Sequence, residues 1–338
     1  MIERSPPSPP SAYLNQSLVG RFIGLFRMPR RWFAAAVGVL LTMLLLLAIA
    51  AYGDAPARSR WELWRTGLEP AIIVYILGIH PLLHRRWMLA MASLRSLVDR
   101  PELVPQAWCV NRRAEWTAVL VGSAFAVWDA YTWRLAGPGI FTYMLATDVV
   151  MFSLMAVTIY DGLARTRHLS RIVRRDVQFD LFDRRPLVPL ARWGQTVSLT
   201  FVGGICLSLL FQSYGMLSSV NSIVIYSILV VVSLTLFFTS IWSIHVALLS
   251  AQERELAIVT GHRERARHAL KQGLVGAAPD AAARLYDPVV VFGNYERQVL
   301  EASTWPFDPR VIRQLAASVV APILIYVLKI AVGLSRVA

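Results

Sequence analysis

The sequence predicts an all-α fold: a polytopic transmembrane bundle of seven spans, with its N-terminus in the cytoplasm, its C-terminus outside and a cytoplasmic helical layer. Composition is the first reason, because 56% of the 338 residues are hydrophobic and 16% are charged, whereas soluble domains have about 45–50% apolar and about 25% charged residues. Recurrent apolar runs and a one-sided distribution of basic residues are the other two. Together they exclude a soluble enzyme, a disordered chain and a disulfide-rich secreted module.

Seven apolar runs approach or exceed the length of about 20 residues that crosses a bilayer core. They are residues 32–52, 68–84, 114–134, 139–161, 194–214, 221–248 and 312–334. The first run follows a basic cluster and is longer than the core of a typical signal peptide, so we expect an uncleaved signal anchor. The second run is the shortest and contains Glu69, His80 and Pro81. We count it because the charge balance requires it.

Basic residues set the expected orientation, since Lys and Arg near a span are retained on the cytoplasmic side. If all seven runs cross, 28 of the 34 lysines and arginines lie on the side of the N-terminal tail. This predicts an integral protein of a bacterial-type inner or plasma membrane. The basic face is expected to contact anionic lipid, so the net charge of +13 does not indicate nucleic acid.

The runs divide the chain into six parts. These are a mobile basic tail (1–31), spans one to four (32–160), a cytoplasmic helical extension (161–193), spans five and six (194–248), a cytoplasmic helical region (249–310), and span seven with a short outer tail (311–338).

Spans four and six are expected to continue beyond the membrane. Leu163, Leu169 and Ile172 follow span four at helical spacing. That extension is either a docking surface for the membrane or a partner, or a helix whose arginines face water. Span six should continue into a mixed-charge helix, followed by another helix over about 281–302. Asp287-Pro288 either interrupts that helix or starts a separate one.

A turn with two prolines and a capping aspartate is expected before span seven. It contains Trp305 and Pro306, followed by Asp308 as the expected N-cap and Pro309 at the first helical position. Within the span, Pro322 removes one backbone hydrogen bond and is expected to kink the helix. We expect the turn and this kink to take part in gating, since membrane helices tolerate such breaks.

No arrangement of residues indicates catalysis. The sequence has no phosphate-binding glycine loop, no His-Glu-x-x-His and no Gly-x-Ser-x-Gly. His80 and His84 share a helix face, but no further metal ligand accompanies them. We therefore expect no enzyme activity, no cofactor and no metal.

Four charged residues interrupt the apolar runs: Glu69, Asp129, Asp148 and Lys329. Charges within a membrane are costly, so each is a functional candidate. Counted at 1.5 Å per residue, all four fall in the outer half, with Asp148 the deepest. They predict an acidic outer-leaflet cavity for a cation or small amine. The structural alternative is an ion pair of Lys329 with Asp129 or Asp148, with Lys329 and Glu69 reaching the interface.

In architecture, the chain resembles the insect odorant and gustatory receptor-type channels. The resemblance lies in seven spans with the N-terminus inside, extended spans four and six, and the turn into span seven. Tyr326 matches the tyrosine of that family's last-helix signature, while Lys329 interrupts the apolar run after it. The resemblance implies a homo-oligomer joined by its cytoplasmic layer, with the last helix lining a cation pore.

We therefore expect an oligomeric channel or ligand-gated receptor. The alternatives are a non-catalytic scaffold or accessory subunit of a membrane complex, and a secondary transporter, although no internal repeat is evident.

Overall fold

The computed structural model describes residues 17–26, 29–51, 66–98, 111–131, 138–175, 181–183, 185–212, 220–274, 279–302, 313, 320 and 322–329. Regular structure within these residues is helical, which confirms the predicted all-α class. The main helices are α2 (Leu18–Leu25), α3 (Arg30–Ala51), α5 (Leu68–Leu97), α6 (Arg112–Ala130), α7 (Pro138–Arg175), α8 (Leu187–Phe211), α10 (Val220–Leu274) and α11 (Pro279–Glu301). Residues 322–329 are also helical.

Four helices are long and apolar enough to cross a membrane. The candidate spans are Trp32–Ala50, Phe141–Val173, Leu187–Phe211 and Val224–Gln272, and they correspond to the first, fourth, fifth and sixth predicted runs. Helices α5 and α6 are not apolar enough to be counted as candidate spans, because charged residues lower their mean hydropathy. The seventh run lies mostly outside the described residues. The apolar helices are thus compatible with a membrane protein, and the number seven stays a prediction.

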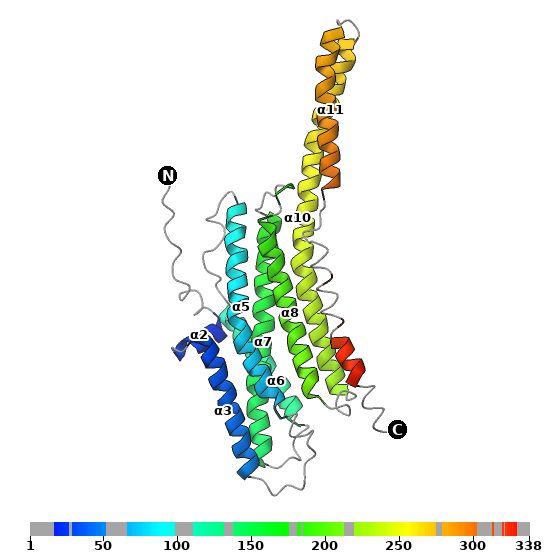
Figure 1. Ribbon diagram of the computed structural model, residues 1–338. Helices are drawn as coiled ribbons and strands as arrows, with labels where there is room; N and C mark the ends of the chain where they lie inside the picture. Colours follow the sequence, from blue (N-terminus) through cyan, green and yellow to red (C-terminus); the bar gives the residue numbers. More distant parts are fainter. Residues whose placement is uncertain are drawn as a thin grey trace.

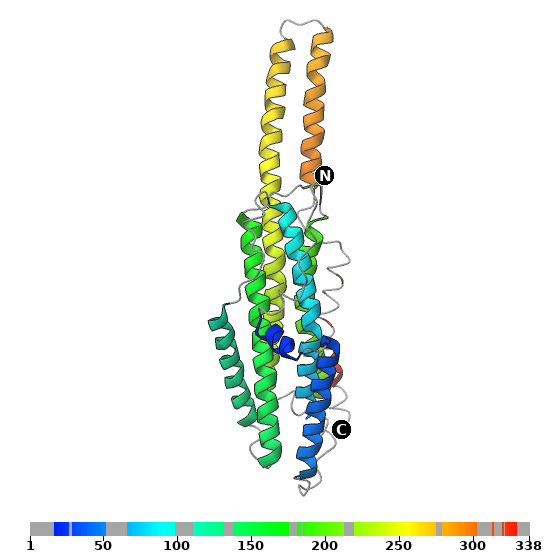
Figure 2. The same cartoon turned by 90° about the vertical axis from the view of Figure 1, so that its left-hand side faces the viewer.

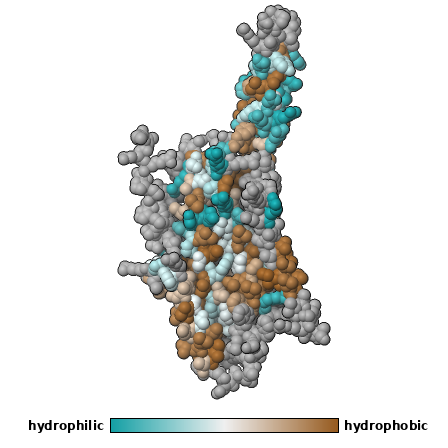
Figure 3. All heavy atoms as spheres, in the orientation of Figure 1, coloured by the Kyte–Doolittle hydropathy of each residue, from teal (hydrophilic) through white to brown (hydrophobic). Residues whose placement is uncertain are grey.

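Five helices, α3, α5, α7, α8 and α10, form one elongated bundle, and α6 packs along α7 (Figures 1 and 2). Helix α11 turns back along the distal half of α10, so the two form a hairpin that projects far beyond the bundle (Figures 1 and 2). We call the end of the bundle from which it projects the hairpin end. Hydrophilic residues gather on the hairpin, whereas hydrophobic residues dominate the lower part of the visible surface (Figure 3).

The expected continuation of spans four and six is confirmed at the level of the helices. Helix α7 has 38 residues and α10 has 55, so α10 is about 80 Å long at 1.5 Å per residue.

Two helix boundaries differ from those expected from the sequence. Helix α11 passes through Pro288 without interruption, because a proline removes one helical hydrogen bond and packing against α10 maintains the rest. Helix α8 begins at Leu187, inside the segment expected as the 161–193 extension.

The hairpin is held by contacts along both helices. Arg263 forms an ion pair with Glu296, and the rings of His262 and Phe292 stack at 5.5 Å. Near the bundle, the Gln252 side-chain amide donates to the Val299 carbonyl at 2.7 Å. This mixture of buried and polar contacts makes α10 and α11 one structural unit.

Residues 17–25, expected as part of a mobile tail, instead form a capped and docked helix. Ser17 accepts a hydrogen bond from the Gly20 N–H as N-cap. Val19 and Ile23 are buried against the bundle, while Phe22 is exposed. The amphipathic spacing of these residues is the physical reason for the correction, because docking the apolar face stabilises a helix this short.

Candidate functional site: a buried acidic cavity

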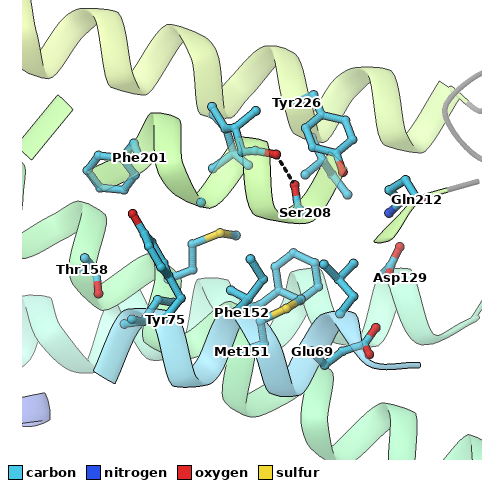
Figure 4. Close-up of a pocket in the computed structure, with 18 of the residues that line it drawn as sticks. Glu69, Tyr75, Asp129, Met151, Phe152, Thr158, Phe201, Ser208, Gln212 and Tyr226 are labelled. Carbon is cyan, nitrogen blue, oxygen red and sulfur yellow. Dashed lines mark hydrogen bonds between the residues drawn. The ribbon is translucent and has the colours of Figure 1, made fainter. Parts of the chain in front are cut away.

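A cavity of about 110 Å³ lies among α5, α6, α7, α8 and α10 (Figure 4). Most of its wall is apolar or aromatic, including Met151 and Phe152 of α7 and Phe201 of α8. It lies mainly in the part of the bundle away from the hairpin. A largely apolar cavity with a few convergent polar groups is the usual form of a small-molecule site.

The acidic groups gather at one end of the cavity. Glu69, Asp129 and Gln212 lie together there, and Tyr75, Thr158 and Phe201 lie toward the other end (Figure 4). The three acidic-end residues come from the start of α5 and the ends of α6 and α8. Distant segments therefore combine to place two carboxyl groups and an amide at one end of an apolar chamber.

Glu69 is the most buried carboxylate of the cavity, with 3% of its surface exposed. It belongs to the first turn of α5, where the positive end of the helix dipole stabilises a carboxylate. The start of α5 thus places Glu69 at the acidic end of the cavity.

Close contact between α6 and α7 positions Asp129. A Cβ atom at Gly122 would lie 2.5 Å from the Phe152 carbonyl oxygen, so the two backbones approach as closely as small residues allow. The hydroxyls of Ser123 and Ser153 lie 3.2 Å apart beside this contact. Asp129 follows Gly122 by two helical turns and therefore shares its face, which directs the side chain toward the cavity.

A second close approach, between α5 and α8, fixes the opposite end of the cavity. The Tyr75 hydroxyl donates to the Thr200 carbonyl at 2.8 Å. A Cβ atom at Gly203 would lie 2.4 Å from that hydroxyl, so a larger residue there would displace the ring. These two contacts fix the Tyr75 side chain, and its ring forms a rigid part of the cavity wall.

Asp148 of α7 is buried but is not among the residues that line the cavity. It is 1% exposed and lies one turn from Met151 and Phe152, which do line it. Its proposed role at a ligand stays a prediction.

Lys329 donates to backbone carbonyls at the end of α8. Its ammonium donates to the carbonyls of Leu210 and Gln212, at 2.9 and 2.7 Å. These carbonyls close the C-terminal end of α8, where a positive charge is favourable. The lysine is thereby joined to Gln212, which lines the cavity, and the alternative pairing with Asp129 or Asp148 stays a prediction.

The expected gating residues are only partly described. Pro322 is buried at the start of the helical stretch 322–329. Trp305, Pro306, Asp308 and Pro309 lie outside the described residues, so their expected role is untested.

A smaller polar cavity, of about 20 Å³, continues toward the hairpin end. His80, His84, Asp161 and Arg165 line it, together with Ser17 below α2. Asp161 and Arg165 form an ion pair of 2.7 Å, and the Arg165 guanidinium packs over the Trp87 ring. Thr158 and Phe201 line both cavities, so these two side chains form the partition between them.

The sequence indicated two of the cavity residues, Glu69 and Asp129, because charge in an apolar run is conspicuous. It did not single out Tyr75, Thr158 or Gln212, which are common polar residues of membrane helices. The one available signal was the spacing of Glu69, Ile72 and Ile76, which places them on one face of α5.

No group of three or more His, Cys, Asp or Glu side chains suited to a metal occurs within the described residues. The two carboxylates of the cavity, Glu69 and Asp129, can accept hydrogen bonds and pair with positive charge. No protein-family model, curated protein or solved structure matches this chain.

Proposed function

We propose that this protein is an oligomeric channel or ligand-gated receptor whose buried cavity binds a cation or small amine. The observation that carries the proposal is the convergence of Glu69 and Asp129 on one end of an apolar, aromatic-lined cavity. An ammonium group can pair with the carboxylates while its apolar part contacts Phe152, Phe201 or Tyr226. Aromatic rings also attract cations through their faces.

Electrostatics favours a cationic ligand over a neutral one. Holding a buried carboxylate in its charged form costs free energy, and a nearby cation offsets part of that cost because the interaction is stronger at low dielectric constant. The proposed ligand thus stabilises the charged state of the cavity on binding. A ligand anion would add to the repulsion instead.

Seven spans with the N-terminus inside remain part of the proposal. Helices α5 and α6 lie alongside the apolar helices (Figure 2), although charge reduces their hydropathy. The outward face of α6 presents Leu120, Phe125 and Trp128, as expected of a helix in contact with lipid. Arg95 of α5 and Arg171 of α7 lie toward the hairpin end, which supports assigning that end to the cytoplasm.

The hairpin supports the oligomeric part of the proposal. Ile258, Val291 and Leu300 expose more than half of their surface on it, and the architectural resemblance to the insect receptor-type channels implies contacts between subunits at this layer. A scaffold or accessory subunit is the second candidate, because the same hairpin offers a large projecting surface (Figure 1). Co-purification of a fixed partner, with no ligand binding, would favour the scaffold.

Equilibrium binding tests the cavity. We expect saturable binding of radiolabelled 2-phenylethylamine to the full chain in nanodiscs, and about tenfold weaker binding for Glu69→Gln or Asp129→Asn, equivalent to about 1.4 kcal/mol. Glu253→Gln is the matched control, because Glu253 is an exposed carboxylate of α10 in the hairpin. Absence of saturable binding, or equal affinities for all variants, would overturn the proposal. Cation uptake into proteoliposomes then separates a channel from a non-conducting receptor.

A further inference from the structure

An apolar groove of about 480 Å³ runs between α6 and α10, with α7 as its floor. Val121 and Phe125 form its α6 side, and Ile228 its α10 side; all three are exposed on the bundle surface. The groove wall is almost entirely apolar, with Thr117 and Tyr160 as the polar groups nearest the hairpin end. Such a surface is stable only where it faces hydrocarbon or an apolar ligand.

The groove and the acidic cavity share part of their walls. Phe152 and Met155 of α7 and Ile225 and Leu229 of α10 line both. These four side chains are thus the barrier between the surface groove and the chamber that holds Glu69. No charged residue stands in that barrier, so an apolar group crosses it without losing polar contacts.

We infer that the ligand enters the cavity laterally from the membrane, through this groove. We also infer that this ligand is an amphiphilic amine that partitions into the bilayer. This inference rests on the proposed binding of an amine and adds the route and the chemical class. The aromatic or alkyl part of such a ligand matches the groove wall. Its amine nitrogen reaches the carboxylates only after passing Met155 and Leu229, and it passes as the uncharged base, because an ammonium ion would lose its solvation there.

Packing identifies which side of the barrier moves. The α7 backbone at Phe152 is in contact with α6 at Gly122, so these two helices cannot separate or slide without losing that close packing. Met155 lies one turn beyond the contact. It has a flexible, unbranched side chain that changes rotamer at low cost. Opening therefore requires rotation of Met155, Ile225 and Leu229 side chains rather than movement of α6.

Binding kinetics in nanodiscs test the route. Ile228→Trp fills the groove without touching the cavity, because Ile228 lines only the groove. We expect this variant to slow association and dissociation of radiolabelled 2-phenylethylamine by a similar factor of about ten, leaving Kd unchanged. Met155→Ala should accelerate both rates. Val231→Trp is the matched control, because Val231 is an exposed α10 residue outside the groove.

The outcomes separate the two proposals. If the wild-type chain binds no amine, both fail. If it binds with Glu69-dependent affinity while Ile228→Trp and Met155→Ala keep wild-type rates, the lateral route alone is overturned. A second readout is independent of folding: association to the wild-type chain should increase with the bilayer partitioning of a series of primary amines. An association rate that does not vary with partitioning across that series would also reject the route.

Discussion

Arg21 of α2 and Glu115 of α6 form an ion pair of 2.8 Å in which the carboxylate is 1% exposed. The same carboxylate accepts a hydrogen bond from the Leu18 N–H at 2.9 Å. One buried acid thereby neutralises the arginine and satisfies an N-terminal amide of α2. This helix therefore depends on a residue that lies almost one hundred positions further along the chain.

Replacing Glu115 with Gln should loosen α2. The amide retains a hydrogen-bond acceptor for Leu18 but loses the charge that holds Arg21, so we expect a loss of about 1–2 kcal/mol in docking free energy. Faster proteolysis between α2 and α3 in detergent measures it. Glu264→Gln, at an exposed site in the hairpin, is the control. Protease resistance equal to wild type would show that the pair contributes nothing to docking.

Gly122→Ala should destabilise the α6–α7 pair. The new methyl group would meet the Phe152 carbonyl, which is backbone and cannot rotate away, and overpacking of this kind costs about 1–3 kcal/mol. Thermal unfolding in detergent is the measurement, and amine affinity should fall as Asp129 shifts. Gly78→Ala is the matched control because nothing lies within 4 Å of its Cβ position. An equal melting temperature for both variants would contradict the close-packing argument.

Lys329→Met and Asp129→Asn should have independent effects on stability. Lys329 donates to carbonyls of α8, so its loss weakens that helix end by about 1 kcal/mol without changing the aspartate. A double-mutant cycle on thermal unfolding should give a coupling within about 0.5 kcal/mol. A larger coupling would restore the ion pair that the sequence offered as an alternative.

Phe201→Leu should connect the acidic cavity with the smaller polar one. The leucine keeps the site apolar but removes the ring that stands, with Thr158, between the two chambers. If the path conducts, cation uptake into proteoliposomes should increase severalfold. Phe237→Leu controls for stability because Phe237 is similarly buried but lines neither cavity. Equal uptake by the two variants would show that Phe201 is a structural residue only.

Local properties of the sequence determined the all-α class and the apolar helices, because hydropathy and helical period depend on neighbouring residues alone. The same reasoning anticipated that α7 and α10 would be long. It was less successful at Ser17–Leu25, which was expected to belong to the mobile basic tail of residues 1–31. Besides its docked apolar face, α2 is held by Glu115, a long-range contact that periodicity cannot reveal.

The sequence alone also singled out the charged residues as candidates, since a carboxylate in an apolar run is costly wherever it points. Depth along a helix distinguished Asp148, but depth carries no information on which side of the helix faces a cavity. Tertiary packing determines which side of each helix faces the cavity. Gly122 against Phe152, and Tyr75 against Gly203, set the rotation of α6 and α5, and this rotation brings Glu69 and Asp129 to one chamber.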